Sequence, residues 1–269
     1  MKNVRSVPKL PRRARDAHKG TFGTVLVVAG SHDMLGAAVL CATAALRGGA
    51  GLVRVGLPRD LQPLLPLAVP CATTVVRTTR ALRDAAAAAD AVVVGPGLGT
   101  SAATARVVAD VLASCVGTVV LDADALNVLA PLRAPLRSRA KLVITPHPGE
   151  AARLLEVDTR AVQADRTRAL ETLWARSGAV VVLKGARTLV GDGRRCFTNT
   201  TGNPGMATGG SGDVLAGLLA ALLAQGMAPF EAACAAVHVH GRAGDRVARR
   251  LSEPGLLASD LPLAIAELL

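Results

Sequence analysis

The sequence is poor in aromatic side chains: its 269 residues include three Phe, one Trp and no Tyr. The formal net charge is nevertheless +11, and a basic chain suits nucleic acid, a membrane surface or an anionic small molecule. Nucleic-acid-binding proteins commonly stack bases on aromatic rings, and none of their known sequence modules occurs in this chain. We therefore expect no nucleic-acid partner and favour phosphate-bearing small molecules.

Long apolar runs are also missing. Hydrophobic residues make up 51% of the chain, but their runs are alanine-rich, interrupted by Gly or charge, and shorter than the ~20 residues that a bilayer requires. The basic segment 1–18 has neither an apolar core nor a small-residue cleavage site, so it is not a secretory signal. We expect a cytoplasmic protein without a membrane partner.

Cysteine is sparse and scattered. Its odd number and wide spacing fit neither a disulfide framework nor a zinc site, and we expect buried, reduced thiols at Cys41, Cys71, Cys115, Cys196 and Cys234. Two nucleotide-binding signatures are absent as well. The turn GPGLG, which contains Gly97 and Gly99, lacks the full GxGxxG spacing, and no GxxxxGK[ST] occurs, so a Rossmann reading is weak and the P-loop class is excluded.

What the chain does contain is an alternation of apolar runs and helical segments, which predicts an α/β fold with a mostly parallel sheet. Buried strands are predicted at Val25–Ala29, Leu52–Leu57, Asp90–Val94, Thr118–Leu121, Lys141–Ile144 and Ala179–Leu183, and a hairpin at Thr188–Phe197. One helix is predicted to begin at Gly36. Further helices are predicted at Ala81–Ala89, Ala102–Cys115, Glu150–Leu155, 159–177, Pro229–Arg250 and Asp260–Leu269. We expect one domain, residues 19–269, preceded by a basic arm, residues 1–18, that is either loosely ordered or a first helix.

The stretch Asn203–Gly217, NPGMATGGSGDVLAG, combines a glycine-rich turn with the start of an apolar helix. Gly209, Gly210 and Gly212 allow successive amide N–H groups to turn toward one point, where the helix dipole also favours an anion. A carboxylate at this place, Asp213, repels a phosphate, so its natural role is to accept a proton from a hydroxyl that attacks phosphorus. The alternative is that Asp213 only caps the helix.

Polar and glycine residues follow five of the predicted strands, at Gly30, Gly95–Gly99, Asp122–Asn127, His147–Glu150 and Lys184–Gly185. Because ligands of open parallel sheets bind beyond the carboxyl ends of the strands, these residues are expected on one face. Lys184 is either a phosphate ligand, together with Arg187 and Thr188, or a solvated surface lysine. Asp122 and Asp124 either cap the helix that follows or, with Glu150, hold a hydrated Mg²⁺. His147 either has a structural role or takes part in binding at the site.

Eight motifs follow one another between about Lys19 and Arg246: HKGTFGTVLVVAGS, GAAVL, LRGGAGLV, VVVGPGLG, LDADALN, TPHPGEAARLL, VVLKGARTLV and NPGMATGGSGDVLAG. Together they resemble the ADP-dependent NAD(P)H-hydrate dehydratases, the carbohydrate-kinase-like family of the ribokinase-like fold. The resemblance implies a three-layer α/β/α sandwich. It also implies a repair reaction in which the S form of hydrated NADH or NADPH loses its water at the expense of ADP or ATP, giving AMP and phosphate from ADP.

The resemblance assigns roles to individual residues. Asp213 is then the base, and the amides around Gly209–Gly212, Gly210 and Gly212 among them, stabilise the transferring phosphoryl group. ADP contacts are implied for Lys184, Gly185, Ala186, Arg187, Thr188 and Gly212. Contacts to the hydrated dinucleotide are implied for Ala38, Gly97, Gly99, His147 and Asp213. Mg²⁺ is the expected cofactor, with Asp122 and Glu150 as its candidate ligands.

Two alternatives stay open. A small-alcohol kinase resembling hydroxyethylthiazole kinase would have TPN where this chain has Thr145–Pro146–His147, and a non-catalytic nucleotide-binding protein would need no base. His147, GPGLG and KGTFG favour the dehydratase, and Ser211 replaces a common threonine. Since only about 18 residues precede the match, we expect the NAD(P)H-hydrate epimerase of the pathway to be a separate chain. The apolar helices between residues 213 and 250 suit a subunit interface, so we expect a homo-oligomer such as a tetramer.

Overall fold

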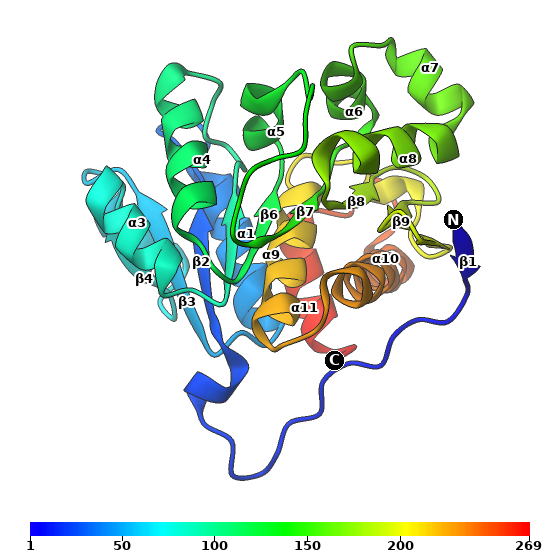
Figure 1. Cartoon of the computed structure of the whole chain (residues 1–269). Coiled ribbons are helices and arrows are strands. Elements are labelled where there is room, and N and C mark those ends of the chain that lie inside the picture. Colours follow the sequence, from blue (N-terminus) through cyan, green and yellow to red (C-terminus); the bar gives the residue numbers. More distant parts are fainter.

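The computed structural model describes residues 1–269 (Figure 1). Its strands are β1 (Lys2–Val4), β2 (Thr24–Val28), β3 (Leu52–Leu57), β4 (Thr73–Val76), β5 (Ala91–Val94), β6 (Thr118–Leu121), β7 (Lys141–Ile144), β8 (Val180–Leu183), β9 (Leu189–Gly191) and β10 (Arg195–Thr198). Its α-helices are α1 (Leu35–Arg47), α2 (Leu65–Ala68), α3 (Thr79–Ala87), α4 (Ala102–Ser114), α5 (Asp124–Leu129), α6 (Pro148–Leu155), α7 (Thr159–Ala164), α8 (Arg166–Ser177), α9 (Ser211–Ala224), α10 (Pro229–Leu251) and α11 (Leu261–Ala266). Short 3₁₀ turns lie at η1 (Lys19–Phe22), η2 (Gln62–Leu64), η3 (Pro204–Met206) and η4 (Ala258–Asp260).

All ten strands form one sheet in the order β1-β10-β9-β8-β7-β6-β5-β2-β3-β4. The seven strands from β8 to β4 pair in parallel, whereas β9 runs antiparallel to β8 and β10. The expected α/β fold with a mostly parallel sheet is confirmed. Parallel pairing brings the carboxyl ends of β2, β5, β6, β7 and β8 to one edge, as the polar residues after these strands predicted.

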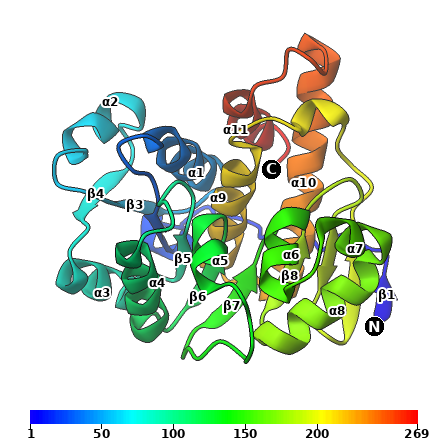
Figure 2. The same cartoon turned by 90° about the horizontal axis from the view of Figure 1, so that it is seen from above.

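Helices cover both faces of the sheet and give three layers (Figures 1 and 2). Along β2, Val25 and Val27 belong to the core beneath α1, α9, α10 and α11, while Leu26 and Val28 belong to the core beneath α3, α4, α5, α6 and α8. Successive side chains of a strand point to opposite faces, so a strand buried on both sides must be apolar at every position. This requirement explains the unbroken valine and leucine runs of the central strands.

Helix α9 is the most enclosed helix of the molecule. Twelve of its 14 residues are buried, and the two that are not buried are Gly212 and Asp213. The apolar surface of α9 is therefore used inside the chain, against the sheet and α1, and does not support a subunit interface. Only the first turn of the helix, which follows the glycine-rich turn, reaches solvent.

Some of the predicted elements need correction. Residues 159–177 form two helices, because Asp165 leaves the helical region at φ −141° and ψ 80° and its side chain accepts from the N–H of Arg168 to begin α8. The helix expected over Asp260–Leu269 is shorter, since residues 258–260 form η4 and α11 ends at Ala266.

The N-terminal arm is neither loose throughout nor helical. Residues Lys2–Val4 form β1, which pairs in parallel with β10 at the edge of the sheet. Farther along the arm, the guanidinium of Arg13 lies 3.9 Å from the centre of the Phe22 ring and donates to the carbonyl of Gly49 at 2.6 Å. The arm is thus tied at both ends (Figure 1).

All five cysteines are free thiols, as expected, but not all are buried. Cys41, Cys115 and Cys234 are buried, Cys196 is half-buried and Cys71 is exposed. Cys71 lies between the short helix α2 and strand β4, in a region without a strong periodic pattern. No helix is both long and apolar enough to span a bilayer.

Candidate active site

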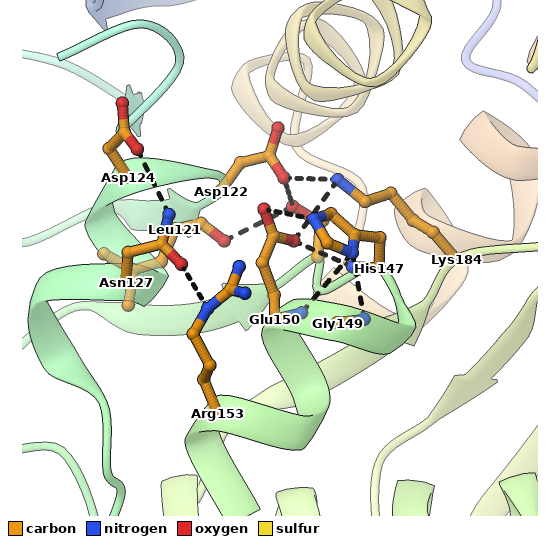
Figure 3. A network of polar contacts seen from close by, with 10 residues as sticks. Leu121, Asp122, Asp124, Asn127, His147, Gly149, Glu150, Arg153 and Lys184 are labelled. Carbon is orange, nitrogen blue, oxygen red and sulfur yellow. Dashed lines mark hydrogen bonds and ion pairs between the residues drawn. The ribbon is translucent and has the colours of Figure 1, made fainter. Parts of the chain in front are cut away.

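A lysine and two carboxylates from three neighbouring strand ends meet at the carboxyl edge of the sheet (Figure 3). The Nζ atom of Lys184, after β8, lies 2.7 Å from Oδ1 of Asp122, after β6, and 3.9 Å from Oε2 of Glu150, in α6. Only 17% of the Lys184 side chain is exposed, against 1% for Asp122. Lys184 is therefore not a solvated surface lysine.

Charge decides the protonation of this lysine. Burial alone would lower the pKa of Lys184, but the carboxylates of Asp122 and Glu150 outweigh burial and hold that pKa above its ordinary value. Asp122 is held in place by a second donor, Oγ1 of Thr145, at 2.8 Å. The result is a fixed ammonium group at the centre of the strand ends.

His147 forms the N-terminal cap of α6. Its Nδ1 accepts from the N–H of Gly149 at 3.0 Å, and its own backbone N–H donates to Oε2 of Glu150 at 2.8 Å, which is a reciprocal capping box. Because Nδ1 is an acceptor, Nε2 carries the proton, and it lies 3.2 Å from Oε1 of Glu150. Burial, followed by the charge of Lys184, lowers the pKa of His147, so the ring is neutral.

Asp124 ties the GPGLG turn to the site. Its Oδ2 accepts from the N–H of Gly99 at 2.8 Å, and its Oδ1 accepts from Nδ2 of Asn127 at 3.1 Å. The Oδ1 atom of Asn127 in turn accepts from Nε of Arg153 (Figure 3). Asp124 is the first residue of α5, but its carboxylate tethers the neighbouring loop instead of capping the helix.

The glycine-rich turn ends at Gly210, which is the N-cap of α9 with φ +91°. A side chain there would be strained and would also strike Leu40, since an added Cβ would lie 2.4 Å from its Cδ1. A Cβ added at Gly212 would lie 3.3 Å from Nζ of Lys184. The lysine ammonium thus lies directly against the start of α9.

Asp213 is the third residue of α9, and it does not cap the helix. No hydrogen bond within the protein contributes to the state of its carboxylate. Burial, and then repulsion from Asp122, raise the pKa of Asp213 to about 7, although Lys184 acts in the opposite direction. A partly buried carboxyl group with a pKa near neutrality and no hydrogen-bond partner is suited to proton transfer.

The KGART loop connects β8 to β9 beside Lys184. Gly185, Ala186 and Arg187 are exposed, and Gly185 and Arg187 have positive φ angles of 129° and 56°. The Oγ1 atom of Thr188 closes the loop by donating to the carbonyl of Gly185 at 2.9 Å. The loop is therefore shaped and accessible.

Arg166 supports this loop and was not singled out from the sequence. Its Nη2 donates to the carbonyls of Leu183 at 3.0 Å and Lys184 at 3.2 Å. The sequence signal that could have found it is Asp165, whose capping side chain begins a new helix at Arg166. Without that break, Arg166 reads as one of many exposed helical arginines.

Two residues expected to touch the dinucleotide lie in the wall of the site rather than on its surface. Ala38 has no exposed area and packs against Gly30, and Gly97 packs against Met34 and Ala37. His147 is exposed, and Gly99 is partly exposed. Contacts to a ligand on this side must therefore come from the residues that reach solvent.

Arg77 is a further cation, half-buried, that sequence reasoning missed. It closes the carboxyl ends of β2 and β3 by donating to the carbonyls of Ala29, Gly30 and Gly56. Burial lowers its pKa to about 10, and no carboxylate compensates its charge. Its partners are backbone carbonyls, so no acidic residue in the sequence indicates where the Arg77 side chain binds.

The site thus combines a proton acceptor, a fixed ammonium group and a turn of backbone donors, a set suited to phosphoryl transfer. No group of three or more His, Cys, Asp or Glu side chains is arranged to hold a metal ion. Asp122 and Glu150, the candidate Mg²⁺ ligands, both face Lys184 instead.

Comparison with known proteins points to one family. A family model described as NAD(P)H-hydrate dehydratase matches residues 25–266. The ADP-dependent (S)-NAD(P)H-hydrate dehydratase of Neisseria meningitidis is 46% identical over 93% of this chain and 86% of that protein. The bifunctional NAD(P)H-hydrate repair enzyme of Moorella thermoacetica is 41% identical over 94% of this chain. This chain spans about half the length, 50%, of that bifunctional relative.

Solved structures agree with the sequence comparisons. The ADP/ATP-dependent NAD(P)H-hydrate dehydratase of Bacillus subtilis, co-crystallised with ATP and Mg²⁺, superposes with a TM-score of 0.87 at 33% identity, covering 96% of this chain and 93% of that one. A ribokinase-like superfamily protein from Enterococcus faecalis gives a TM-score of 0.88 at 30% identity, over 96% and 90% of the two chains. The chain belongs to the NAD(P)H-hydrate dehydratase family and has the ribokinase-like fold.

Proposed function

We propose that this chain restores NADH and NADPH from the S form of their hydrates, using ADP or ATP. The single observation that carries the proposal is the carboxylate of Asp213, which lies without a hydrogen-bond partner on the first turn of α9 beside Lys184 and has a pKa of about 7. A group of this kind can take a proton from a hydroxyl at neutral pH. The names of the relatives supply the hydroxyl: that of the hydrated nicotinamide ring.

In the proposed reaction, the ring hydroxyl attacks the terminal phosphorus of the nucleotide. The new bond joins the ring oxygen to phosphorus, the phosphorus–oxygen bond to the leaving nucleotide breaks, and Asp213 accepts the hydroxyl proton. With ADP the leaving nucleotide is AMP. The ring carbon–oxygen bond then breaks and releases phosphate, a far better leaving group than hydroxide. A proton leaves the neighbouring ring carbon to solvent, and the electrons of that carbon–hydrogen bond form the ring double bond, so the same site yields a net dehydration.

The glycine-rich turn is proposed to hold the transferring phosphoryl group. The N–H groups near Gly209, Gly210 and Gly212, at the positive end of the α9 dipole, are donors that need no rearrangement when charge develops. Lys184 lies against Gly212 and supplies a fixed positive charge. The exposed loop Gly185–Arg187 and Thr188 are proposed to contact the nucleotide.

The dinucleotide is proposed to bind on the other side of Asp213, between the GPGLG turn and His147. Asp124 fixes the turn through Gly99, and Glu150 fixes the neutral ring of His147. Ala38 and Gly97 would shape the wall from behind, since both are buried.

Mg²⁺ is proposed to arrive on the nucleotide phosphates. Lys184 lies between Asp122 and Glu150 and already compensates their charge, so the two carboxylates fit hydrogen bonds from the water molecules of the ion better than direct ligation. Mg²⁺ usually keeps several of its waters in proteins. When bound, the ion would offset the negative charge of the phosphates.

We propose that the chain acts in the cytoplasm, that an NAD(P)H-hydrate epimerase converts the other hydrate isomer, and that the chain assembles with copies of itself. Light scattering of the purified protein at several concentrations tests the last of these. The buried surface of α9 leaves the interface to other elements.

One spectrophotometric experiment tests the proposed reaction. Protein, Mg²⁺ and hydrated NADH or NADPH are mixed with ADP, with ATP or without nucleotide, and the recovery of dihydronicotinamide absorbance is followed together with released phosphate. We expect recovery only with nucleotide, and phosphate in equal amount. A small-alcohol kinase would instead accumulate a stable phosphoester without recovery, and folded protein that shows neither product would refute both.

A further inference from the structure

One face of α10 packs against the segment that leads into the glycine-rich turn. Gly241 and Gly244 permit the close approach, because a Cβ added at Gly241 would lie 2.2 Å from Oγ1 of Thr201, and one added at Gly244 would lie 2.2 Å from Sδ of Met206. These two glycines belong to the sequence HVHGRAGD, residues 238–245, which the proposed function leaves without a role.

Polar side chains tie the segment to α10 at its beginning. The Nδ2 atom of Asn199 donates to the carbonyl of Val237 at 3.1 Å, and Oγ1 of Thr201 donates to the carbonyl of His238 at 3.0 Å. Asn199 is buried. These contacts fix the point at which the chain leaves β10.

Asp245 ties the middle of the segment. Its Oδ2 accepts from the N–H of Gly202 at 3.0 Å, and its Oδ1 accepts from Nδ2 of Asn203 at 3.1 Å. The Oδ1 atom of Asn203 then accepts from the N–H of Gly205 at 3.0 Å and begins η3. The Asp245 carboxylate is thus committed to these two donors.

The far end of the segment is also held by α10. Oγ of Ser211, the first residue of α9, lies 3.5 Å from Nε2 of His240, and both side chains are buried. Helix α10 thus contacts the chain before and after the glycine-rich turn. Between these contacts the turn is open at Gly209, since nothing lies within 4 Å of a Cβ added there, whereas Gly210 packs against Leu40 and Ala258.

We propose that Asp245 is a positioning residue for the phosphoryl-transfer step: its hydrogen bonds to Gly202 and Asn203 set where the donors of the glycine-rich turn point. The inference rests on the proposed function. Asp213 stands on α9, which is anchored by its own core contacts, so loss of the Asp245 contacts displaces the turn relative to the base. Because nucleotide and dinucleotide are held mainly by other loops, loss of the Asp245 contacts should lower kcat more than it raises KM.

Exchange of an acid and an amide between the two positions tests the proposal. In Asp245→Asn, the new amide nitrogen faces Nδ2 of Asn203, and the hydrogen bond is lost. In Asn203→Asp, two carboxylates face each other. In the double variant, the amide introduced at position 245 can donate to the carboxylate introduced at position 203, which still accepts from the N–H of Gly205, so all three hydrogen bonds can form again.

We expect each single variant to lose about tenfold to a hundredfold in kcat, with KM for both substrates within about twofold of wild type. The double variant should recover to within about threefold of wild type. Asp192→Asn is the matched control, since the Asp192 carboxylate likewise accepts from both backbone and side-chain donors, but in the β9–β10 hairpin. Its donors are the N–H groups of Arg194 and Arg195 and the Nε of Arg195. We expect its kcat to stay within about twofold of wild type.

Hydrogen exchange at the amides of residues 205–211 gives a readout that does not depend on activity. Exchange should accelerate in Asp245→Asn, return in the double variant and be unchanged in Asp192→Asn. Unaltered exchange and kcat in Asp245→Asn, or a folded double variant without recovery, would overturn the proposal. If the exchange pattern is as expected but wild-type protein has no dehydratase activity, the proposed function fails while the role of Asp245 in ordering the turn stands.

Discussion

The Nζ atom of Lys184 lies 2.7 Å from Oδ1 of Asp122, although 62 positions separate the two residues in the sequence. The pair joins the ends of β8 and β6, which are not neighbours in the sheet, since β7 lies between them. Both side chains are largely removed from solvent. A buried ion pair of this kind contributes little net stability when intact, but breaking it leaves an uncompensated charge.

Lys184→Met should therefore destabilise the protein, because the Asp122 carboxylate would be left buried without its cation. We expect a loss of about 3–5 kcal/mol in the free energy of unfolding, measured by urea denaturation at neutral pH. The double variant Asp122→Asn with Lys184→Met should recover part of that loss, since it removes the stranded charge of Asp122 but leaves that of Glu150. A Lys184→Met variant as stable as wild type would show that the pair is not buried in solution.

Asp213→Asn should abolish turnover while leaving nucleotide binding intact. Asparagine keeps the shape of the side chain but cannot accept the hydroxyl proton, and loss of a general base typically costs about 10²–10⁴-fold in rate. Steady-state rates and nucleotide affinity by calorimetry check the two halves of the prediction. Asp84→Asn, on the exposed surface of α3, is the control and should behave as wild type. Undiminished turnover in Asp213→Asn would remove Asp213 from the mechanism.

The pH dependence of activity follows from the pKa of Asp213, which burial and Asp122 raise to about 7. Below that pH the carboxyl group is protonated and cannot act as a base; above it the carboxylate is active. We therefore expect kcat/KM to fall about tenfold for each pH unit below 7 and to level off above 7. In Lys184→Met the fall in kcat/KM should begin at a higher pH, because Lys184 lowers the pKa of Asp213 in the wild-type protein. A fall of kcat/KM that begins only near the ordinary pKa of aspartate, about 4, would contradict the role of Asp213 as the base.

Much of the sheet could be predicted because local pattern determined it. The strands Leu52–Leu57, Thr118–Leu121 and Lys141–Ile144 begin and end where expected, since apolar residues dominate each of them and their only polar side chains are those of Arg54, Thr118 and Lys141. Strand β1 could not be found in this way. Its residues Lys2–Val4 are polar for the most part, and they become a strand because β10, much farther along the chain, offers backbone groups on the side that does not pair with β9.

The strand ends of the site were predictable, but the partners of their side chains were not. Parallel strands place their carboxyl ends together, which was enough to group Asp122, Glu150 and Lys184. Whether Asp122 meets a metal ion or a lysine depends on side-chain packing across three strands, which no local pattern records. Arg77 shows the same limit, because its partners are the carbonyls of Ala29, Gly30 and Gly56, and backbone carbonyls are common to every residue.

The contact between α1 and α9, which places the first turn of α9 in the site, depends on Gly217. A Cβ added there would lie 2.1 Å from the carbonyl oxygen of Cys41 in α1. Gly217→Ala should lower the free energy of unfolding by about 1–3 kcal/mol, because the helices must move apart, even though alanine favours a helix over glycine by about 1 kcal/mol. Thermal unfolding checks this against Gly36→Ala.

Gly36 is the matched control because it also lies in a helix, α1, but has open space around an added Cβ. In Gly36→Ala only the helix preference acts, so the variant should be as stable as wild type or slightly more stable. The opposite signs of the two substitutions separate the effect of helix packing from the intrinsic effect of replacing glycine. Equal stability changes in the two variants would mean that α9 can shift away from α1, and the position of Asp213 would then not be set by this contact.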